Sequence, residues 1–363
     1  MLGLKFKNLW VAEIFSAALV IGSLASASRA NDSSVSASPS GGLIFEKSDS
    51  VKMKSEYLYI SLDRIVVKYV FKNTSKSDVK TKVGFPLPTI DPVEAEFSFR
   101  EPHDAEFRVK VNGKSISSDI DIRVLRRNHK AFDSAGHIRR KDIDITTAFN
   151  ELGLDPFDDN IGQGKVTEKL KSLGVICNDP DDNHEFGCWS TKKTYFWDQI
   201  FPAGKEVKIE HMYIPWPGSY NEVTAINPRQ SIFIDECMDE SFIRAYSKLS
   251  GFPLSEYDIG IDEYSGRRAY ILKKNADDSL FKKVRGWPPQ FSQANIEYIL
   301  TTGANWSGPI GNFTLEINKG DAALISFCPI PGVRMVRSGH SFVGKARDFI
   351  PKSDLSIYLI IPH

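Results

Sequence analysis

The segment VFKNTSKSDVKTKVGFPLP, residues 70–88, joins two apolar stretches through a polar turn and stops at two closely spaced prolines. Before the turn, apolar side chains recur at every second position, the pattern of a half-buried strand: Ile65, Val67, Tyr69 and Phe71. Residues 73–78 favour a turn because their short polar side chains hydrogen-bond the nearby backbone. The segment therefore predicts an antiparallel hairpin over residues 64–85.

Pro86 and Pro88 indicate where the second of these strands leaves its sheet. A proline lacks a backbone N–H and fixes φ at about −65°, so it does not continue the interior of a sheet. We expect Phe85 and Leu87, which alternate with the prolines, to close the edge of the core.

Further strand signals follow along the chain. Asn112-Gly113 separates two short alternating stretches and is the strongest two-residue hairpin signal. The segment KTYFWDQIFPAGKEVKIEHMYIPWPG, residues 193–218, suggests another strand pair around a Pro-Ala-Gly turn. Many short strands with closely spaced turns predict a mainly β fold, an antiparallel β-sandwich or sandwiches with a short helical insertion and one further helix.

Three segments have helical spacing. Thr146–Leu152 and Val166–Leu173 are each followed by glycine, the residue that commonly ends a helix, and predict an insertion at about 143–175. A third helix is predicted at about 239–250 from three-and-four spacing of apolar residues. We expect a β-sandwich domain at 43–226 and a C-terminal mainly β domain at 227–363.

The first thirty residues predict a signal peptide, with Lys5 and Lys7 before an apolar run and small residues before Asn31. We expect cleavage between Ala30 and Asn31 and export, in a bacterium to the periplasm. An uncleaved anchor is the alternative, but the apolar run is shorter than the about 20 residues of a spanning helix. Residues 31–42 are rich in Ser, Ala and Gly and predict a flexible leader.

Charge and motif content narrow the function classes. Lysine plus arginine number 46, as do aspartate plus glutamate, so nothing electrostatic suggests nucleic acid as a partner. The mature chain contains no second long apolar run, so no transmembrane segment is predicted in it. The standard motifs of metalloproteases, serine hydrolases and nucleotide-binding enzymes are absent, and no cofactor is expected. Catalytic groups can still converge from distant strands.

The four cysteines, in an exported chain, are expected to form disulfides. Three pairings are possible. Cys177 and Cys188 bracket a short polar loop, so we expect them to pair and, by elimination, Cys237 to pair with Cys328. A zinc site is the alternative, but the chain has no Cys-x-x-Cys spacing and its histidines are scattered.

Several segments together resemble one bacterial exported family, the domain of unknown function 4424. They are GGLIFEKSDSVKMKSEYLYISLDRIVVKYVFKNTSKSDVKTKVGFPLP, FPAGKEVKIEHMYIPWPG and TGANWSGPIGNFTLEINKG. The resemblance covers about residues 41–361 and implies no activity. The family usually carries cysteines near the third helix and after the late SFC strand, which favours the Cys237–Cys328 pair.

A weaker resemblance, over roughly residues 56–225, is to the sandwich domain of vault and inter-alpha-trypsin inhibitor type. There a polar turn and an FPLP strand end precede an NGK hairpin and a late PAG turn. As an analogy of fold alone, it favours an interaction module over an enzyme.

Two sets of residues are weighed as chemical sites. The acidic loop contains Asp179, Asp181, Asp182 and Glu185. These side chains could offer oxygen ligands to Ca²⁺. The alternative is a solvated surface loop, since the residues lack the spacing of an EF-hand and an exposed acidic loop is normally just solvated. His211 could act as an acid or base near neutral pH. Because Ile209 and Tyr213 alternate with it on one strand face, a half-buried, hydrogen-bonded histidine is the simpler interpretation.

Two tryptophans are candidates for binding. Trp306 lies between glycines in TGANWSGPIG, and Trp216 lies between prolines in IPWPG. An exposed indole in a loop can stack on a sugar or anchor a protein partner. The alternative for each is a ring folded back over the core.

The leading hypothesis is an exported, non-catalytic binding or structural module of the cell envelope. Its partner is expected to be an envelope protein or glycan, contacted through Trp216 and Trp306. The alternative is an envelope hydrolase acting on polysaccharide or peptide, with His211 and unidentified carboxylates. A Ca²⁺-stabilised structural module is a third, lesser hypothesis.

Overall fold

The computed structural model describes most of the chain between residues 33 and 362. The described residues are 33–37, 43–90, 105–126, 142–158, 164–178, 185–216, 222–223, 232–233, 240–250, 255, 257–261, 268–273 and 291–362. The predicted signal peptide and its cleavage site lie outside them. In the described part, no helix is long and apolar enough to span a membrane.

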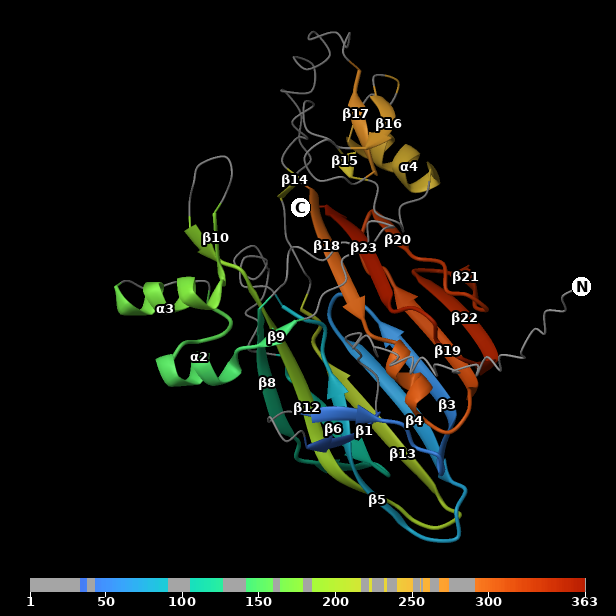
Figure 1. Cartoon of the computed structure of the whole chain (residues 1–363). Helices are drawn as coiled ribbons and strands as arrows, with labels where there is room; N and C mark the ends of the chain where they lie inside the picture. Colours follow the sequence, from blue (N-terminus) through green and yellow to red (C-terminus); the bar gives the residue numbers. More distant parts are fainter. Residues whose placement is uncertain are drawn as a thin grey trace, which may run out of the picture.

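An eight-stranded sheet forms one layer of the molecule (Figure 1). Its pairs are antiparallel except for a parallel pair between β3 and β19. In spatial order the strands are β21 (Arg334–Ser338), β22 (Ser341–Phe349), β19 (Ile310–Asn318), β3 (Val51–Ile60), β4 (Ile65–Asn73), β13 (Glu206–Tyr213), β6 (Arg108–Val111) and β7 (Lys114–Ile116).

Two smaller sheets form the opposite layer. The six-stranded sheet has the order β2 (Leu43–Glu46), β1 (Ser33–Ala37), β5 (Val79–Pro86), β12 (Trp189–Phe201), β8 (Asp119–Arg126) and β9 (Ile143–Asp144). The four-stranded sheet has the order β14 (Glu222–Val223), β18 (Phe291–Tyr298), β23 (Leu355–Pro362) and β20 (Leu324–Phe327). Apolar side chains from all three sheets meet in one buried cluster. The predicted mainly β sandwich is therefore confirmed.

The hairpin predicted over residues 64–85 is wrong in its pairing. The strands β4 and β5 form as expected, but β4 lies in the eight-stranded sheet and β5 in the six-stranded sheet. The second suggested pair, β12 and β13, is likewise divided between the layers. In each case the turn carries the chain across the sandwich, so the two strands face each other through the core instead of sharing a ladder.

The two crossing turns lie against each other and are joined by hydrogen bonds. Asn73 is fully buried, and its Nδ2 donates to the backbone oxygens of Ser77 and Phe201, each at 2.8 Å. Its backbone N donates to the oxygen of Lys205. The Oδ1 atom of Asp78 accepts from the backbone N of Ala203 at 2.8 Å. The polar turn residues thus fix the spacing between the layers.

The strand end at the prolines is confirmed, since β5 ends at Pro86. Phe85 is fully buried and Leu87 nearly so, as expected for side chains that close the edge of the core. The two-residue Asn112-Gly113 hairpin is also confirmed, because Val111 pairs with Lys114 across it.

The helices lie where their spacing predicts. The insertion contains α2 (Thr146–Leu152) and α3 (Lys165–Leu173), and each ends at a glycine in the left-handed conformation. They pack with Val124 and Trp189 in a second, smaller apolar cluster. The remaining elements are α4 (Glu240–Ser250), the 3-10 helix η2 (Thr301–Asn305), the pair β10 (Ile176–Asn178) and β11 (Glu185–Gly187), and a sheet of β15 (Ile232–Phe233), β17 (Arg268–Leu272) and β16 (Tyr257–Ile261).

Part of the predicted flexible leader is ordered. Residues 33–37 form β1, which pairs with both β2 and β5. The side chain of Ser33 is fully buried and its Oγ accepts a hydrogen bond from Asn305 Nδ2 at 2.9 Å. The amino-acid composition of this segment did not predict a strand. The strand forms because the small side chains of β1 allow close pairing with the edge of β5.

The chain on both sides of the predicted boundary near residues 227–228 contributes to the same sheet. β19 pairs with β3 along six registered positions, from Asn312 opposite Ser55 to Ile317 opposite Ile60. Both halves also supply the same buried cluster. A division into domains at that boundary would separate hydrogen-bonded neighbours.

We expect stability to fall at alkaline pH because Tyr57, which is half-buried, and Tyr257, which is buried, resist ionisation. Burial and a hydrogen bond to Glu316 raise the pKa of Tyr57 to about 12, and burial raises the pKa of Tyr257 to about 12. Unfolded tyrosine has a pKa of about 10. Since the folded pKa is the higher one, this stabilisation is complete below about pH 10 and is lost as the pH rises to about 12.

The measurement is the melting temperature from pH 8 to pH 12, with Tyr57→Phe as the matched variant. Phenylalanine keeps the ring but has no proton to lose, so its melting temperature should fall less steeply above pH 10. A wild-type curve that stays flat to pH 12 would contradict this expectation.

Candidate functional site

His211 lies in the centre of the sandwich and has no exposed surface. Its ring is surrounded by four aromatic rings, with centroid distances of 5.6 Å to Tyr69, 5.0 Å to Phe85, 5.3 Å to Phe107 and 5.2 Å to Trp197. A substrate would have to displace these rings to reach the imidazole. The histidine is more deeply buried than its strand pattern suggested, and its candidacy as a catalytic residue is not supported.

Trp306 is also a core residue. Its side chain has no exposed surface, and its ring centroid lies 4.5 Å from that of Phe71 and 5.7 Å from that of Phe201. A fully enclosed indole cannot stack on a sugar or enter a partner's pocket. We therefore correct the expected binding role of Trp306. Trp306 directly follows the 3-10 helix η2, which ends at Asn305.

Trp216 follows β13 and is half-buried. Pro215 before it is buried. Of the two tryptophans, this one retains accessible surface for a partner.

The disulfide between Cys177 and Cys188 is confirmed, with an S–S distance of 2.07 Å. It closes the β10–β11 pair beside the helical insertion. Cys328 is disulfide-bonded as well. Cys237 lies outside the described residues, so its pairing with Cys328 stays a prediction.

The candidate calcium loop falls largely outside the described residues, which include Glu185 but not Asp179, Asp181 or Asp182. Glu185 pairs with Lys171 of α3, its Oε1 lying 2.8 Å from Nζ. Within the described ranges, no three His, Cys, Asp or Glu side chains are grouped closely enough to hold a metal ion.

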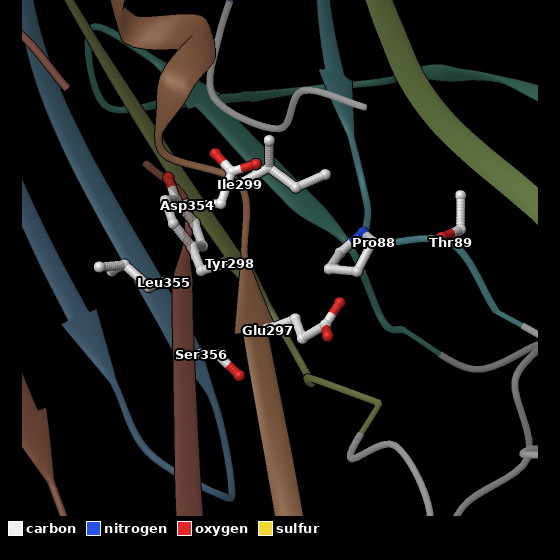
Figure 2. Close-up of a pocket in the computed structure, with 8 residues that line it drawn as sticks. All are labelled: Pro88, Thr89, Glu297, Tyr298, Ile299, Asp354, Leu355 and Ser356. Atoms are coloured by element: carbon white, nitrogen blue, oxygen red, sulfur yellow. The ribbon is translucent and has the colours of Figure 1, made fainter. Parts of the chain in front are cut away.

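A pocket opens at the seam where the two smaller sheets meet (Figure 2). Pro88 and Thr89, just after β5, form one wall, and the ends of β18 and β23 form the other. The pocket is partly open to solvent and offers about 190 Å³. Since a water molecule occupies roughly 30 Å³ of liquid, this space suits a small group or the end of a longer chain.

Two carboxylates give the pocket its charge. Glu297 of β18 and Asp354, just before β23, both line it and both are exposed. In Figure 2 the Glu297 side chain extends from its strand toward the Pro88 wall. Asp354 is held in position, because its Oδ1 accepts hydrogen bonds from the backbone N and the Oγ1 of Thr301, at 3.0 and 2.8 Å.

The rest of the lining is apolar or hydroxylic. Ile299 and Leu355 are almost fully buried and form an apolar base, and Ser356 pairs with Glu297 across the β18–β23 ladder. Among the residues that the structure describes, the lining includes no lysine, arginine or histidine. Negative charge over an apolar base suits a cation carried on a short apolar chain.

Sequence reasoning missed this pocket because its walls come from three distant segments, near residues 88, 298 and 355. The one available signal was the FPLP strand end. It indicated that the chain leaves the sheet there, but not which side chains it would face.

Three comparisons with known proteins were informative to different degrees: one identifies a family, one finds no match, and one finds a distantly similar solved structure. No curated protein matches. A solved structure from Legionella pneumophila, described as a "putative nutrient binding protein", is 15% identical, with 86% of this chain and 68% of that chain covered and a TM-score of 0.37. A similarity at that TM-score carries no argument for this chain.

The family model for a domain of unknown function, DUF4424, matches residues 30–358. This range includes every strand and helix named above apart from the last residues of β23. The weaker resemblance to the vault and inter-alpha-trypsin inhibitor sandwich gains no support from this match. The chain belongs to the DUF4424 family.

Proposed function

We propose that this protein is an exported, non-catalytic binding module of the bacterial envelope, and that its seam pocket takes the ammonium group of an envelope component. The observation that carries the proposal is that two carboxylates, Glu297 and Asp354, line a pocket whose described lining residues include no cationic side chain. An ammonium group donates charge-assisted hydrogen bonds to carboxylates, which are about twice as strong as neutral ones.

Two kinds of envelope component carry an ammonium group, and they correspond to the protein or glycan partner expected from the sequence. A lysine side chain carries an ammonium on four methylenes, and a deacetylated amino sugar carries one on a ring. The volume of about 190 Å³ suits the end of a lysine side chain and its methylenes against Ile299 and Leu355. Lysine is therefore the favoured source, and the amino sugar is the second.

Export is supported by the predicted signal peptide and by the disulfide Cys177–Cys188, since disulfides persist in oxidising compartments. The hydrolase alternative relied on His211, which four aromatic rings enclose. Trp216 stays a proposed contact for the partner because part of its surface is accessible.

The test is calorimetric titration of the mature protein with n-butylammonium, which mimics the end of a lysine side chain. Butyrate is the control of opposite charge, and glucosamine represents the amino sugar. We expect binding of butylammonium and none of butyrate. Stronger binding of glucosamine would assign the site to glycan instead of protein.

Isosteric variants locate the site. Glu297→Gln and Asp354→Asn should each weaken butylammonium binding about tenfold, the equivalent of about 1.4 kcal/mol for a charge-assisted hydrogen bond. In Asp354→Asn the side-chain carbonyl can still accept from Thr301, so the fold is preserved. Asp321→Asn, at an exposed turn away from the pocket, is the matched control. Equal weakening in all three variants would assign the effect to net charge and reject the pocket.

A further inference from the structure

In the part of the chain that the structure describes, no strand pairs with the outer edge of the first part of β8. On one side β8 pairs with β12 over its whole length, from Asp119 to Arg126. On the other side, among the described residues, the short strand β9 reaches only Leu125 and Arg126. Val124 is also occupied there, because its N donates to Thr146 Oγ1 and its oxygen accepts from the N of Ile145.

The free stretch is therefore Asp119–Arg123. Since Val124 directs its N–H and C=O to the edge, Ile120 and Ile122 do so as well by the two-residue period of a strand. The residues before this stretch, Ser117 and Ser118, cross from β7 in the opposite layer, so β8 begins at Asp119.

This edge is apolar on one face. Ile120 is 51% exposed, Ile122 is 37% exposed, and Ile143 of β9, which is paired with Arg126, is 42% exposed. These are three of the seven large apolar side chains that stand out as exposed in the described chain. An apolar edge with unpaired backbone groups is a site for strand addition.

Charge on the other face selects the occupant. Asp119, Asp121 and Arg123 alternate with the isoleucines, so the free stretch reads Asp-Ile-Asp-Ile-Arg. An antiparallel second copy centred on Asp121 places Asp119 opposite Arg123 twice and Ile120 opposite Ile122 twice. The central Asp121 residues face each other, but each already accepts from Arg123 Nε of its own chain, at 3.1 and 3.2 Å. Arg123 Nη1 also donates to Asp144 Oδ2 of its own chain at 3.3 Å, which leaves Nη2 to meet Asp119 of the second copy.

The two neighbouring registers of the antiparallel pairing are less favourable than the one centred on Asp121. A pairing centred on Ile120 sets Asp119 against Asp121 twice, and like charges directly opposite are destabilising. A pairing centred on Ile122 needs the backbone groups of Val124, which Thr146 and Ile145 occupy. In the register centred on Asp121, the second copy's strand begins opposite Arg123, one residue before Val124, whose backbone groups are occupied.

We propose that two copies of this chain associate through antiparallel pairing of Asp119–Arg123, which joins their six-stranded sheets into one. The interface is independent of the seam pocket. Homodimers with two-fold symmetry are the commonest assemblies of soluble proteins, and an edge that complements itself meets their geometric requirement.

The first test is a cross-link at the two-fold axis. Asp121 directs its N–H and C=O to β12, so in the dimer it forms a non-hydrogen-bonded pair with Cα atoms about 4.5 Å apart. That separation lies within the range of about 4.4–6.8 Å that a disulfide needs. Asp121→Cys should therefore form a disulfide-linked dimer, seen on a non-reducing gel. In the described part of the chain no native cysteine is free to compete.

Asp119→Cys is the matched control, because its two copies lie at opposite ends of the paired stretch and should not cross-link. A mixture of Asp119→Cys and Arg123→Cys should give the linked pair. Equal or slower cross-linking of Asp121→Cys compared with Asp119→Cys would overturn the proposal.

The second test is the mass in solution by sedimentation. The unmodified mature protein should sediment at twice the mass of one chain, and Ile122→Pro should halve that mass. Proline removes the N–H that faces the edge and leaves the β12 ladder intact, so the variant should keep its melting temperature. A wild-type protein that stays monomeric at every concentration would also overturn the proposal, whether or not Ile122→Pro folds.

Discussion

Replacing Trp306 with alanine is expected to lower the free energy of unfolding by about 3–5 kcal/mol, the range for deleting a large aromatic side chain from a core. The indole is fully buried between Phe71 of β4 and Phe201 of β12. These two residues lie next to the turns that carry the chain across the sandwich. Removing the ring would leave a cavity beside the turns that join the two layers.

Urea denaturation monitored by circular dichroism measures this loss. Trp306→Phe should lose less, because it keeps a ring between the layers. Trp216→Ala is the comparison at a half-buried position and should also cost less. A loss below about 1 kcal/mol for Trp306→Ala, in the range of ordinary surface changes, would contradict the assignment of Trp306 to the core.

Asn73→Ala is expected to lower the free energy of unfolding by about 2–4 kcal/mol. Asn73 is fully buried, and its side chain donates to Ser77 and Phe201 and accepts from Ser75. Each buried group left without a partner costs about 1–3 kcal/mol. The loss is large because one amide joins the two crossing turns, so alanine would leave the backbone oxygen of Phe201 unsatisfied.

Ser75→Ala is the matched control for this turn. Its Oγ bonds only to Asn73 and Ser77 near the surface, so its removal should cost about 1 kcal/mol or less. The same denaturation experiment compares the two variants. Equal losses would mean that the turn contributes locally and that Asn73 does not join the layers.

The local structure of this chain follows well from its sequence. Alternating apolar residues identify β4 and β13, and the glycines after residues 152 and 173 end α2 and α3 where expected. These features depend on neighbours in the sequence. Periodicity shows which face of a strand is buried, but a strand that pairs with the preceding one and a strand that crosses to the other layer have the same pattern. For this reason β4 and β5 were expected to form a hairpin.

The site depends on contacts between distant segments. The seam pocket requires β18 and β23 to approach Pro88, and the parallel pair of β3 with β19 joins residues more than two hundred positions apart. No local pattern encodes such contacts. The burial of Trp306 was missed for a related reason, since its glycine-rich surroundings fit an outward loop as well as an inward one.

The most direct test of the proposed function is a titration of the ¹⁵N-labelled mature protein with n-butylammonium, followed by amide chemical shifts. The account predicts dose-dependent shifts confined to the pocket walls, at Thr89, Ile299 and Ser356, and their loss in Glu297→Gln combined with Asp354→Asn. Shifts that are absent, or that are spread over the acidic surface and persist in the double variant, would contradict a specific ammonium site at the seam.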